Sequence, residues 1–278
     1  MNLGSLLVQT LPIVLEGKTT GGSTSTVVDS SLSGKYDDDS FKEAIIMIRK
    51  TTDGLAPQNE FSLLSAFVDS TQTFTFSPVA SASVGSGDYY AVADPLYPLA
   101  TVLRLVNQAL HRMGVISLVD TSLTALEQTL EYTLPLRLKA FPLDKVEIGN
   151  ATDGWSELSD YYVLPAAPNS QSKLVFNRQI PFDTITASNY TLRLWYRDYH
   201  PELDTYDDVV SETIPEPLAI QYVKNELMEW AMTGNRLSPE QVQRYQMQRG
   251  DLQMAKSESR INSAQRKLSK FLDIGNMK

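Results

Sequence analysis

The sequence predicts an α+β protein in which two blocks of antiparallel β-strands, each a small sandwich or barrel, are joined by a helix and followed by C-terminal helices. Three observations predict this class. Short segments rich in β-branched and aromatic residues recur between turn signals in two parts of the chain. A segment between them carries apolar residues at three- and four-residue spacing, which is typical of a helix with one buried face. The same helical spacing returns beyond residue 214.

The first β block is expected over residues 19–97, behind an N-terminal arm of residues 1–18. The arm is apolar but contains Pro12, which excludes one continuous helix. A short helix that docks on the rest of the chain, or on a neighbouring subunit, is therefore expected in the arm. The block itself predicts an antiparallel meander, with strands at 24–29, 43–49, 61–68, 71–76 and 89–92.

A connecting helix is predicted over residues 98–114, because Pro98 marks its start and Gly114 its end. The second β block follows over residues 115–213. Residues 201–216 within and after it are acidic and are interpreted as an ordered loop. The sequence leaves open whether the two blocks are layers of one body or two small domains. The predicted strands of the second block are 131–134, 145–148, 161–164, 173–177 and 190–199.

C-terminal helices and an extended tail are predicted over residues 214–278. A helix from 217 to about 233 has a wide apolar face and ends at Gly234-Asn235. From 238 to about 272 the pattern stays helical, but apolar residues are sparse, so this helix has too little apolar surface to be stable alone. We expect it to extend from the body of the protein and to be ordered by partners.

Composition narrows the function. Among 278 residues there is no Cys and there are two His, which excludes disulfides and thiolate metal sites and argues against a His-rich metal centre or a His relay. No apolar run is long enough to predict a membrane helix. The net charge of −9 argues against a protein that coats nucleic acid. We expect a soluble, globular protein that is not an enzyme and needs no cofactor.

The charge is unevenly divided along the chain. Residues 236–278 contain nine basic and four acidic residues, a net charge of +5, which leaves −14 for the first 235 residues. This division indicates that the body and the tail meet different surfaces. The alternative is that the basic residues only solvate an exposed helix.

Motifs for chemistry are incomplete. Gly17-Lys18-Thr19 resembles the end of a phosphate-binding loop, but the glycine that such a loop requires five positions earlier is replaced by Pro12. Asp37-Asp38-Asp39 lacks the other ligands of a calcium loop and is interpreted as a solvated turn. Aromatic residues of the second block are interpreted mainly as packing residues, with a protein- or sugar-contact surface as the alternative. They are Trp155, Tyr161, Tyr162, Trp195, Tyr196 and Tyr199.

Three groups of residues form a wider pattern over most of the chain. The first group, in the opening block, includes Thr26-Val27-Val28-Asp29-Ser30-Ser31-Leu32 and Tyr89-Tyr90-Ala91-Val92. The second is Val106-Asn107-Gln108-Ala109-Leu110. The third pairs Tyr196-Arg197-Asp198-Tyr199-His200-Pro201-Glu202-Leu203 with Ile214-Pro215-Glu216-Pro217-Leu218. Together they resemble neck proteins of tailed bacteriophages, the head-to-tail adaptors or connectors that sit on the portal.

The resemblance implies a structural virion protein that assembles in the host cytoplasm as a ring of twelve copies at the virion neck. It implies four partners, namely the portal protein, a tail or stopper protein, other copies of the chain, and double-stranded DNA that passes without specific binding. No membrane partner is expected. The long β segments leave open a tail-completion or minor tail, receptor-facing protein, and after that a carbohydrate-binding module.

Two sets of site residues follow from this resemblance, and no catalytic, cofactor-binding or metal residue is expected. The basic tail suits a portal-binding helix with contacts at Arg244, Tyr245, Arg249, Leu252, Arg260, Ile261, Leu268 and Phe271. An acidic channel wall would let DNA slide, because like charges oppose binding to phosphates. The channel-facing candidates are Asp204, Asp207, Asp208 and Glu212.

Overall fold

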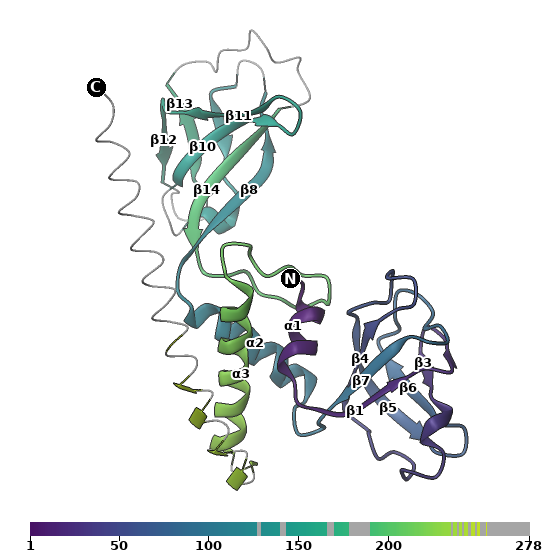
Figure 1. Cartoon of the computed structure of the whole chain (residues 1–278). Coiled ribbons are helices and arrows are strands. Elements are labelled where there is room, and N and C mark those ends of the chain that lie inside the picture. The colour runs from purple at the N-terminus through teal and green to yellow at the C-terminus, as the bar shows by residue number, and fades with distance from the viewer. Residues whose placement is uncertain are drawn as a thin grey trace, which may run out of the picture. The chain divides into compact units, whose positions relative to one another are not determined.

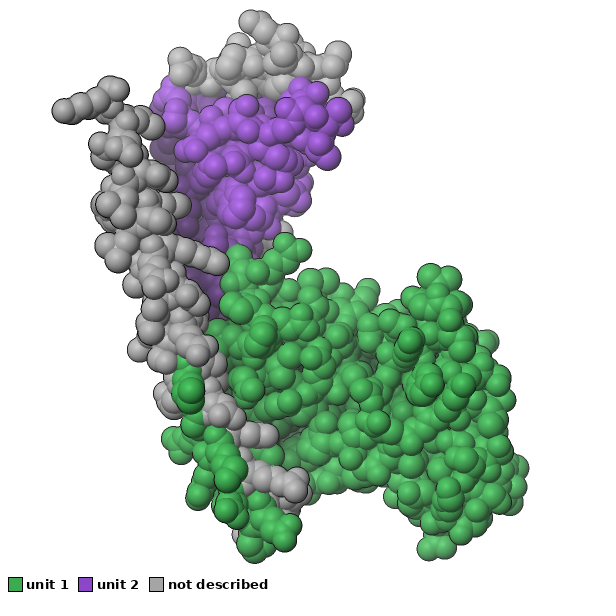
Figure 2. Space-filling view, in the orientation of Figure 1, with its two compact units in different colours: residues 1–113, 201–278 green, residues 114–200 purple. Residues whose placement is uncertain are grey.

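A computed structural model describes most of the chain and divides it into two compact units. Unit 1 contains residues 1–113 and 201–278, and unit 2 contains residues 114–200 (Figure 2). The described residues are 1–126, 129–139, 143–165, 170–177 and 190–234, together with positions 236, 237, 239, 240, 242, 243, 246, 247, 249, 250 and 254.

Seven antiparallel strands form the β part of unit 1 (Figure 1). They are hydrogen-bonded in the order β1-β7-β4-β5-β6-β3-β2. Along β5 buried and exposed residues alternate, and a bulge between Leu64 and Ala66 returns Phe67 to the interior. The strands are β1 (Ile13–Lys18), β2 (Gly21–Gly22), β3 (Thr26–Val28), β4 (Ile45–Lys50), β5 (Phe61–Val68), β6 (Thr73–Ser77) and β7 (Tyr89–Ala93).

The two edges of this sheet are joined by only two residues, Thr19 and Thr20. The Thr19 amide donates to the Asp88 carbonyl (2.8 Å), beside β7, and the Thr20 amide donates to the Val28 carbonyl (2.7 Å), in β3. One bent segment therefore pairs with β7 in its first half and with β3 in its second half. This bend closes the sheet into a small barrel.

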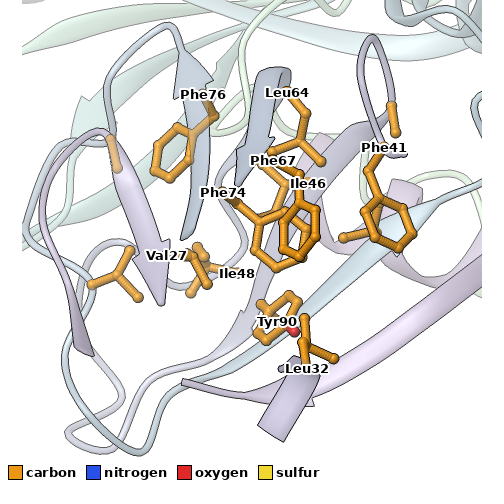
Figure 3. Packing of buried hydrophobic residues seen from close by; sticks show 14 residues of the cluster. Val27, Leu32, Phe41, Ile46, Ile48, Leu64, Phe67, Phe74, Phe76 and Tyr90 are labelled. Atoms are coloured by element: carbon orange, nitrogen blue, oxygen red, sulfur yellow. The ribbon is translucent and has the colours of Figure 1, made fainter. Parts of the chain in front are cut away.

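The barrel is filled by aromatic and aliphatic side chains. Figure 3 shows the rings of Phe67, Phe74 and Tyr90 together in the interior, with ring centroids 4.7 Å apart for the first pair and 5.5 Å for the second. Such tilted aromatic contacts add to the free energy gained by burying apolar area. The other large members of the cluster include Val27, Leu32, Phe41, Ile46, Ile48, Leu64 and Phe76.

Three helices complete unit 1, namely α1 (Leu3–Thr10), α2 (Leu99–Arg112) and α3 (Glu216–Thr233). Asn2 caps α1 by accepting the Ser5 amide (2.9 Å), and α1 packs against α3 and β4. α2 packs on α3, where Arg112 forms ion pairs with Glu226 and Glu229. A short 3-10 helix, η1, follows β3 at Ser30–Leu32.

Unit 2 is a β-sandwich of a four-stranded sheet, β11-β10-β14-β8, and a three-stranded sheet, β12-β13-β9. Both sheets contribute to one core, with Val146 and Leu194 from the first and Leu174 and Phe176 from the second. The strands are β8 (Ile116–Thr124), β9 (Glu131–Thr133), β10 (Leu143–Asn150), β11 (Gly154–Leu158), β12 (Tyr161–Leu164), β13 (Lys173–Phe176) and β14 (Thr191–Asp198), and η2 (Leu136–Lys139) follows β9.

The predicted α+β class with a barrel and a sandwich is confirmed, but some of the expected elements differ. The arm of residues 1–18 holds a strand as well as a helix, because its second half alternates as Ile13, Leu15 and Gly17 inward and Val14, Glu16 and Lys18 outward. The strands β8 and β11 were not expected. The simple meander is also wrong, because β7 is inserted between β1 and β4.

The second unit ends at residue 200, whereas the sequence extended the second β block to residue 213. The reason lies in the backbone of the acidic loop, defined here as residues 201–215. The Leu3 amide donates to the Asp208 carbonyl (2.8 Å) and the Gly4 amide to the Tyr206 carbonyl (3.0 Å). These bonds attach the loop to α1, so it belongs to unit 1.

Candidate functional site

The acidic loop is held in one conformation from two sides. On one side its backbone pairs with the start of α1, where Asn2 and Val209 also form a β-bridge. On the other side Asn107 of α2 forms two hydrogen bonds with the backbone of Leu203. Its Nδ2 donates to the Leu203 carbonyl (2.9 Å), and its Oδ1 accepts the Leu203 amide (2.8 Å). The loop is therefore a preorganised surface of unit 1.

Within the loop the Asp207 carboxylate accepts the Thr205 hydroxyl (2.8 Å), whereas Asp208 accepts backbone amides. Its Oδ2 accepts the backbone amides of Asp204 and Thr205, both at 2.7 Å. These two hydrogen bonds hold the pKa of the Asp208 carboxyl below its ordinary value, against the opposing effect of burial. Asp204, Asp207 and Glu212 are exposed, so all three present carboxylates to the surroundings.

The Asp208 hydrogen bonds predict a pH dependence of the loop. A carboxyl whose folded pKa is lowered adds stability above its ordinary pKa of 3.8, and that stability is lost as the pH falls through the folded pKa. We expect the amide NMR shifts of Asp204 and Thr205 to titrate with a midpoint below 3.8. The Asp208→Asn variant should abolish this titration, whereas a midpoint at or above 3.8 would contradict the assignment.

Asn107→Asp tests whether the hydrogen bonds between Asn107 and Leu203 hold the loop against α2. The substitution replaces the Nδ2 donor with an oxygen, which leaves the buried Leu203 carbonyl facing a carboxylate. We expect unit 1 to lose about 1–3 kcal/mol of stability and residues 201–215 to exchange amide hydrogens faster by mass spectrometry. Gln108→Glu is the matched control, because Gln108 is the next position of α2 and its Oε1 accepts from Arg104 of the same helix (3.5 Å). Equal rates of amide hydrogen exchange for residues 201–215 in both variants would contradict the role of Asn107 in holding the loop.

The predicted portal-binding residues lie mostly outside the described residues. Of the eight, only Arg249 is described, and it is exposed and helical. The neighbouring methionines Met247 and Met254 are 65% and 64% exposed. They are seven positions apart, which is the spacing of residues that share one face of a continuous helix. Arg244, Tyr245, Leu252, Arg260, Ile261, Leu268 and Phe271 are the predicted contacts that fall outside the described part.

A second surface, which the sequence did not predict, lies on the outside of the barrel. Four residues at the ends of β1, β4 and β7 give it its charge and shape: Lys18, Arg49, Lys50 and Tyr89. Together with Glu16, Gly17 and Tyr90 they line a cavity of about 680 Å³, which we call the basic hollow. Arg49 pairs with Glu16, and the Lys18 ammonium lies 5.7 Å from the centre of the Tyr89 ring. The hollow is a local basic site in an acidic unit.

The surroundings of Gly17 explain the glycine of the motif Gly17-Lys18-Thr19. A β-carbon on Gly17 would lie 2.4 Å from Asp29 Oδ2 and 2.6 Å from Tyr90 Oη. The glycine thus lets β1 approach a buried hydrogen bond, in which Tyr90 Oη donates to Asp29 Oδ2 (2.8 Å). Its role is in packing, consistent with the rejection of a phosphate loop on the basis of Pro12.

The aromatic residues of unit 2 divide into three groups. Tyr161 and Tyr196 belong to the sandwich core or pack against it. Trp155 and Trp195 lie among charges, since the Arg193 guanidinium stacks 3.6 Å from the Trp155 ring centre and Trp195 Nε1 donates to Glu147 (2.7 Å). The exposed members are Tyr162 and Tyr199. Packing in the core therefore explains Tyr161 and Tyr196, and contacts with charged side chains explain Trp155 and Trp195.

Glu147 is the centre of the charged group on the four-stranded sheet. It is 8% exposed and forms ion pairs with Lys145 and Arg193 in addition to its bond from Trp195. Burial alone would raise its pKa, but the hydrogen bonds from Lys145 and Trp195 and the two positive charges outweigh this effect and lower the pKa. The Glu147 carboxylate on β10 therefore links this strand to Trp195 and Arg193 on β14.

The Asp-rich turn also has a structural explanation. Asp38 accepts the Asp69 amide (2.7 Å), and Asp69 accepts the Gly34 amide (2.9 Å), so the carboxylates connect two turns. Among the described residues no group of His, Asp and Glu is arranged to hold a metal ion. Within the same part of the chain, no helix combines the length and the hydropathy that a bilayer crossing requires.

No protein-family model matches the sequence, and no curated protein is detectably similar to it.

Proposed function

We propose that this chain is a structural virion protein, a head-to-tail adaptor that forms a ring at the neck between portal and tail, with its C-terminal helix docked on the portal. The observation that carries the proposal is the contrast between α3, which is packed into unit 1, and the segment after it. The described positions from 239 to 254 are helical, and all but the half-buried Val242 are exposed. Met247 and Met254 add a solvent-facing apolar pair. A helix of this kind gains its stability from a partner.

The acidic loop supports the second part of the proposal, a channel that DNA passes without sticking. Its exposed carboxylates Asp204, Asp207 and Glu212 are presented on a rigid support, and a surface of this sign repels phosphates. Tail or stopper proteins are the partners expected at the opposite end of such a ring.

The proposal is tested by mixing the chain with the portal protein encoded in the same genome. Electron microscopy should show a ring docked on the portal, and a chain that stays monomeric in the presence of portal would contradict the proposal. Deleting residues 238–278 should leave both units folded but abolish docking. Undiminished docking of this truncated chain would overturn the role of the tail.

A finer version of the test uses point variants of the exposed methionines. Met247→Ser together with Met254→Ser should weaken docking by about tenfold or more, since two exposed apolar contacts would be lost. Leu55→Ser is the matched control, because Leu55 is 67% exposed on the barrel. An equal effect of both changes would show that general hydrophobicity, and not the tail, governs docking.

The alternative candidate, a tail-completion or receptor-facing protein at the distal end of the tail, is favoured by one observation. Strand β12 is an edge strand of the sandwich, and Tyr162, Val163 and Leu164 on it are all more than a third exposed. An apolar edge of this kind is a template for pairing with another chain. Immunogold labelling distinguishes the two, with label at the neck for the adaptor and at the tail tip for the alternative. The carbohydrate-binding candidate is weakened by Arg193, which covers one face of Trp155.

A further inference from the structure

The basic hollow is an unusual feature in a unit of negative charge. Residues 1–113 contain seven Lys and Arg residues against eleven Asp and Glu residues, and three of the seven line the hollow. Arg49 is paired with Glu16, but among the described residues Lys18 and Lys50 have no carboxylate within ion-pair distance. Three cations and one carboxylate leave the hollow with a net charge of about +2. Its chemistry therefore suits a ligand that carries carboxylates.

The shape and the apolar parts of the hollow indicate a peptide segment as the ligand. A cavity of about 680 Å³ accommodates several side chains. Tyr89 is 49% exposed and offers an amphipathic ring of the kind that anchors protein interfaces. Val14, on the same outward face of β1, is also 49% exposed. The complement of this surface is an acidic segment that also carries an exposed apolar residue.

The acidic loop has these properties. No Lys or Arg occurs between Arg197 and Lys224, and Asp204, Asp207 and Glu212 are exposed. The loop also presents Val209, which is 60% exposed. Because α1 and Asn107 hold the loop in place, little conformational entropy would be lost when it binds.

We infer that the acidic loop of one copy of this chain binds in the basic hollow of the next copy, as the subunit contact of the ring. This inference rests on the proposed function, because it assumes a ring. The two surfaces belong to one compact unit but are different patches of it. A contact between two different patches is head-to-tail, and repeated head-to-tail contacts close into rings when the rotation per subunit divides a full turn.

The inference is tested by reversing charges on each side and then on both. Lys18→Glu with Lys50→Glu should reduce the fraction of chain in rings by about tenfold or more, and so should Asp204→Lys with Asp207→Lys. The four changes in one chain should restore rings, because the charges are again opposite. Ring formation is measured by analytical ultracentrifugation and electron microscopy with portal present. The loss should be larger at about 50 mM than at about 500 mM salt.

The matched control is Lys35→Glu with Lys42→Glu, which changes the net charge of unit 1 equally at two other exposed positions. This control should assemble as the unchanged chain does. If the unchanged chain forms rings and neither reversal disturbs them, the subunit contact lies elsewhere and the adaptor function stands. If both reversals disrupt rings but the combined variant fails to restore them, the inference is overturned. If the unchanged chain forms no ring on portal, the proposed function fails and the inference fails with it.

Discussion

Gly4→Ala is expected to destabilise unit 1 by about 3 kcal/mol. A β-carbon at this position would lie 1.7 Å from the carbonyl oxygen of Asn59 and 2.8 Å from its carbonyl carbon. Both are backbone atoms, so no side-chain rotation can relieve the clash. Relief requires α1 and the Asn59 backbone to move apart, and a shift of α1 would also disturb the hydrogen bond from the Gly4 amide to the Tyr206 carbonyl. The helix and the acidic loop would be displaced together.

The measurement uses the single tryptophan of unit 1, Trp230, as the reporter. The other two tryptophans, Trp155 and Trp195, lie in unit 2, so replacing both with Phe leaves fluorescence that follows unit 1. Urea titration of Gly4→Ala in this background should give a lower midpoint with an unchanged slope. Ser5→Ala, the next position of α1, is the control. A Gly4→Ala variant as stable as this control would contradict the predicted contact between Gly4 and Asn59.

Gly17→Ala is expected to have a comparable effect, about 3 kcal/mol, through the barrel interior. Its β-carbon would enter the space between Asp29 Oδ2 and the Tyr90 ring. Asp29 is 1% exposed and also accepts the Ser31 amide (3.0 Å), so it cannot swing into solvent without releasing η1. Burial, together with Asp29, raises the pKa of Tyr90 well above its ordinary value, so the phenol remains the donor at all ordinary pH values.

A double-mutant cycle separates the steric effect at Gly17 from the loss of the hydrogen bond. Tyr90→Phe alone leaves Asp29 Oδ2 without its buried donor and should cost about 1–3 kcal/mol. Because the two sites share this hydrogen bond, the double variant should lose less stability than the sum of the single variants. Gly21→Ala in β2 is the control, since a β-carbon there has no atom within 4 Å. Additive losses would show that Gly17 and the Tyr90–Asp29 pair act independently.

The sequence predicts best those elements whose residues carry a regular period. β5 and β12 have the expected bounds, and α2 and α3 differ from expectation by one or two residues at their ends. β1 was missed because exposed Val14 hides the alternation of Ile13, Leu15 and Gly17. The closure of the barrel could not be predicted either. It depends on which strands meet across the fold, whereas the hydrophobic period of a strand predicts which of its faces is buried and not which strand is its neighbour.

The candidate surfaces could be predicted only in part, for a similar reason. Charge patterning along the chain indicates the acidic loop, but it does not distinguish half-buried Asp208, which accepts two backbone amides, from its exposed neighbour Asp207. The basic hollow was missed because Lys18, Arg49 and Tyr89 are far apart in sequence and meet only through strand pairing. Asn107 belongs to the sequence pattern described above, but its hydrogen bond to Leu203 joins residues 96 positions apart, so the pattern does not predict the contact.

The interruption of unit 1 by unit 2 has a consequence for biosynthesis. α1 leaves the ribosome long before its partners in the acidic loop, and at about 5–20 residues per second the interval between Gly4 and Tyr206 is on the order of 10–40 s. During that time Leu3, Leu6 and Leu7, which are fully buried in the finished protein, have no loop to cover them. Residues 114–200 are contiguous, so the sandwich can fold before residues 201–278 of unit 1 have been synthesised. In the nascent chain unit 2 can therefore finish folding before unit 1, although unit 1 contains the N-terminus.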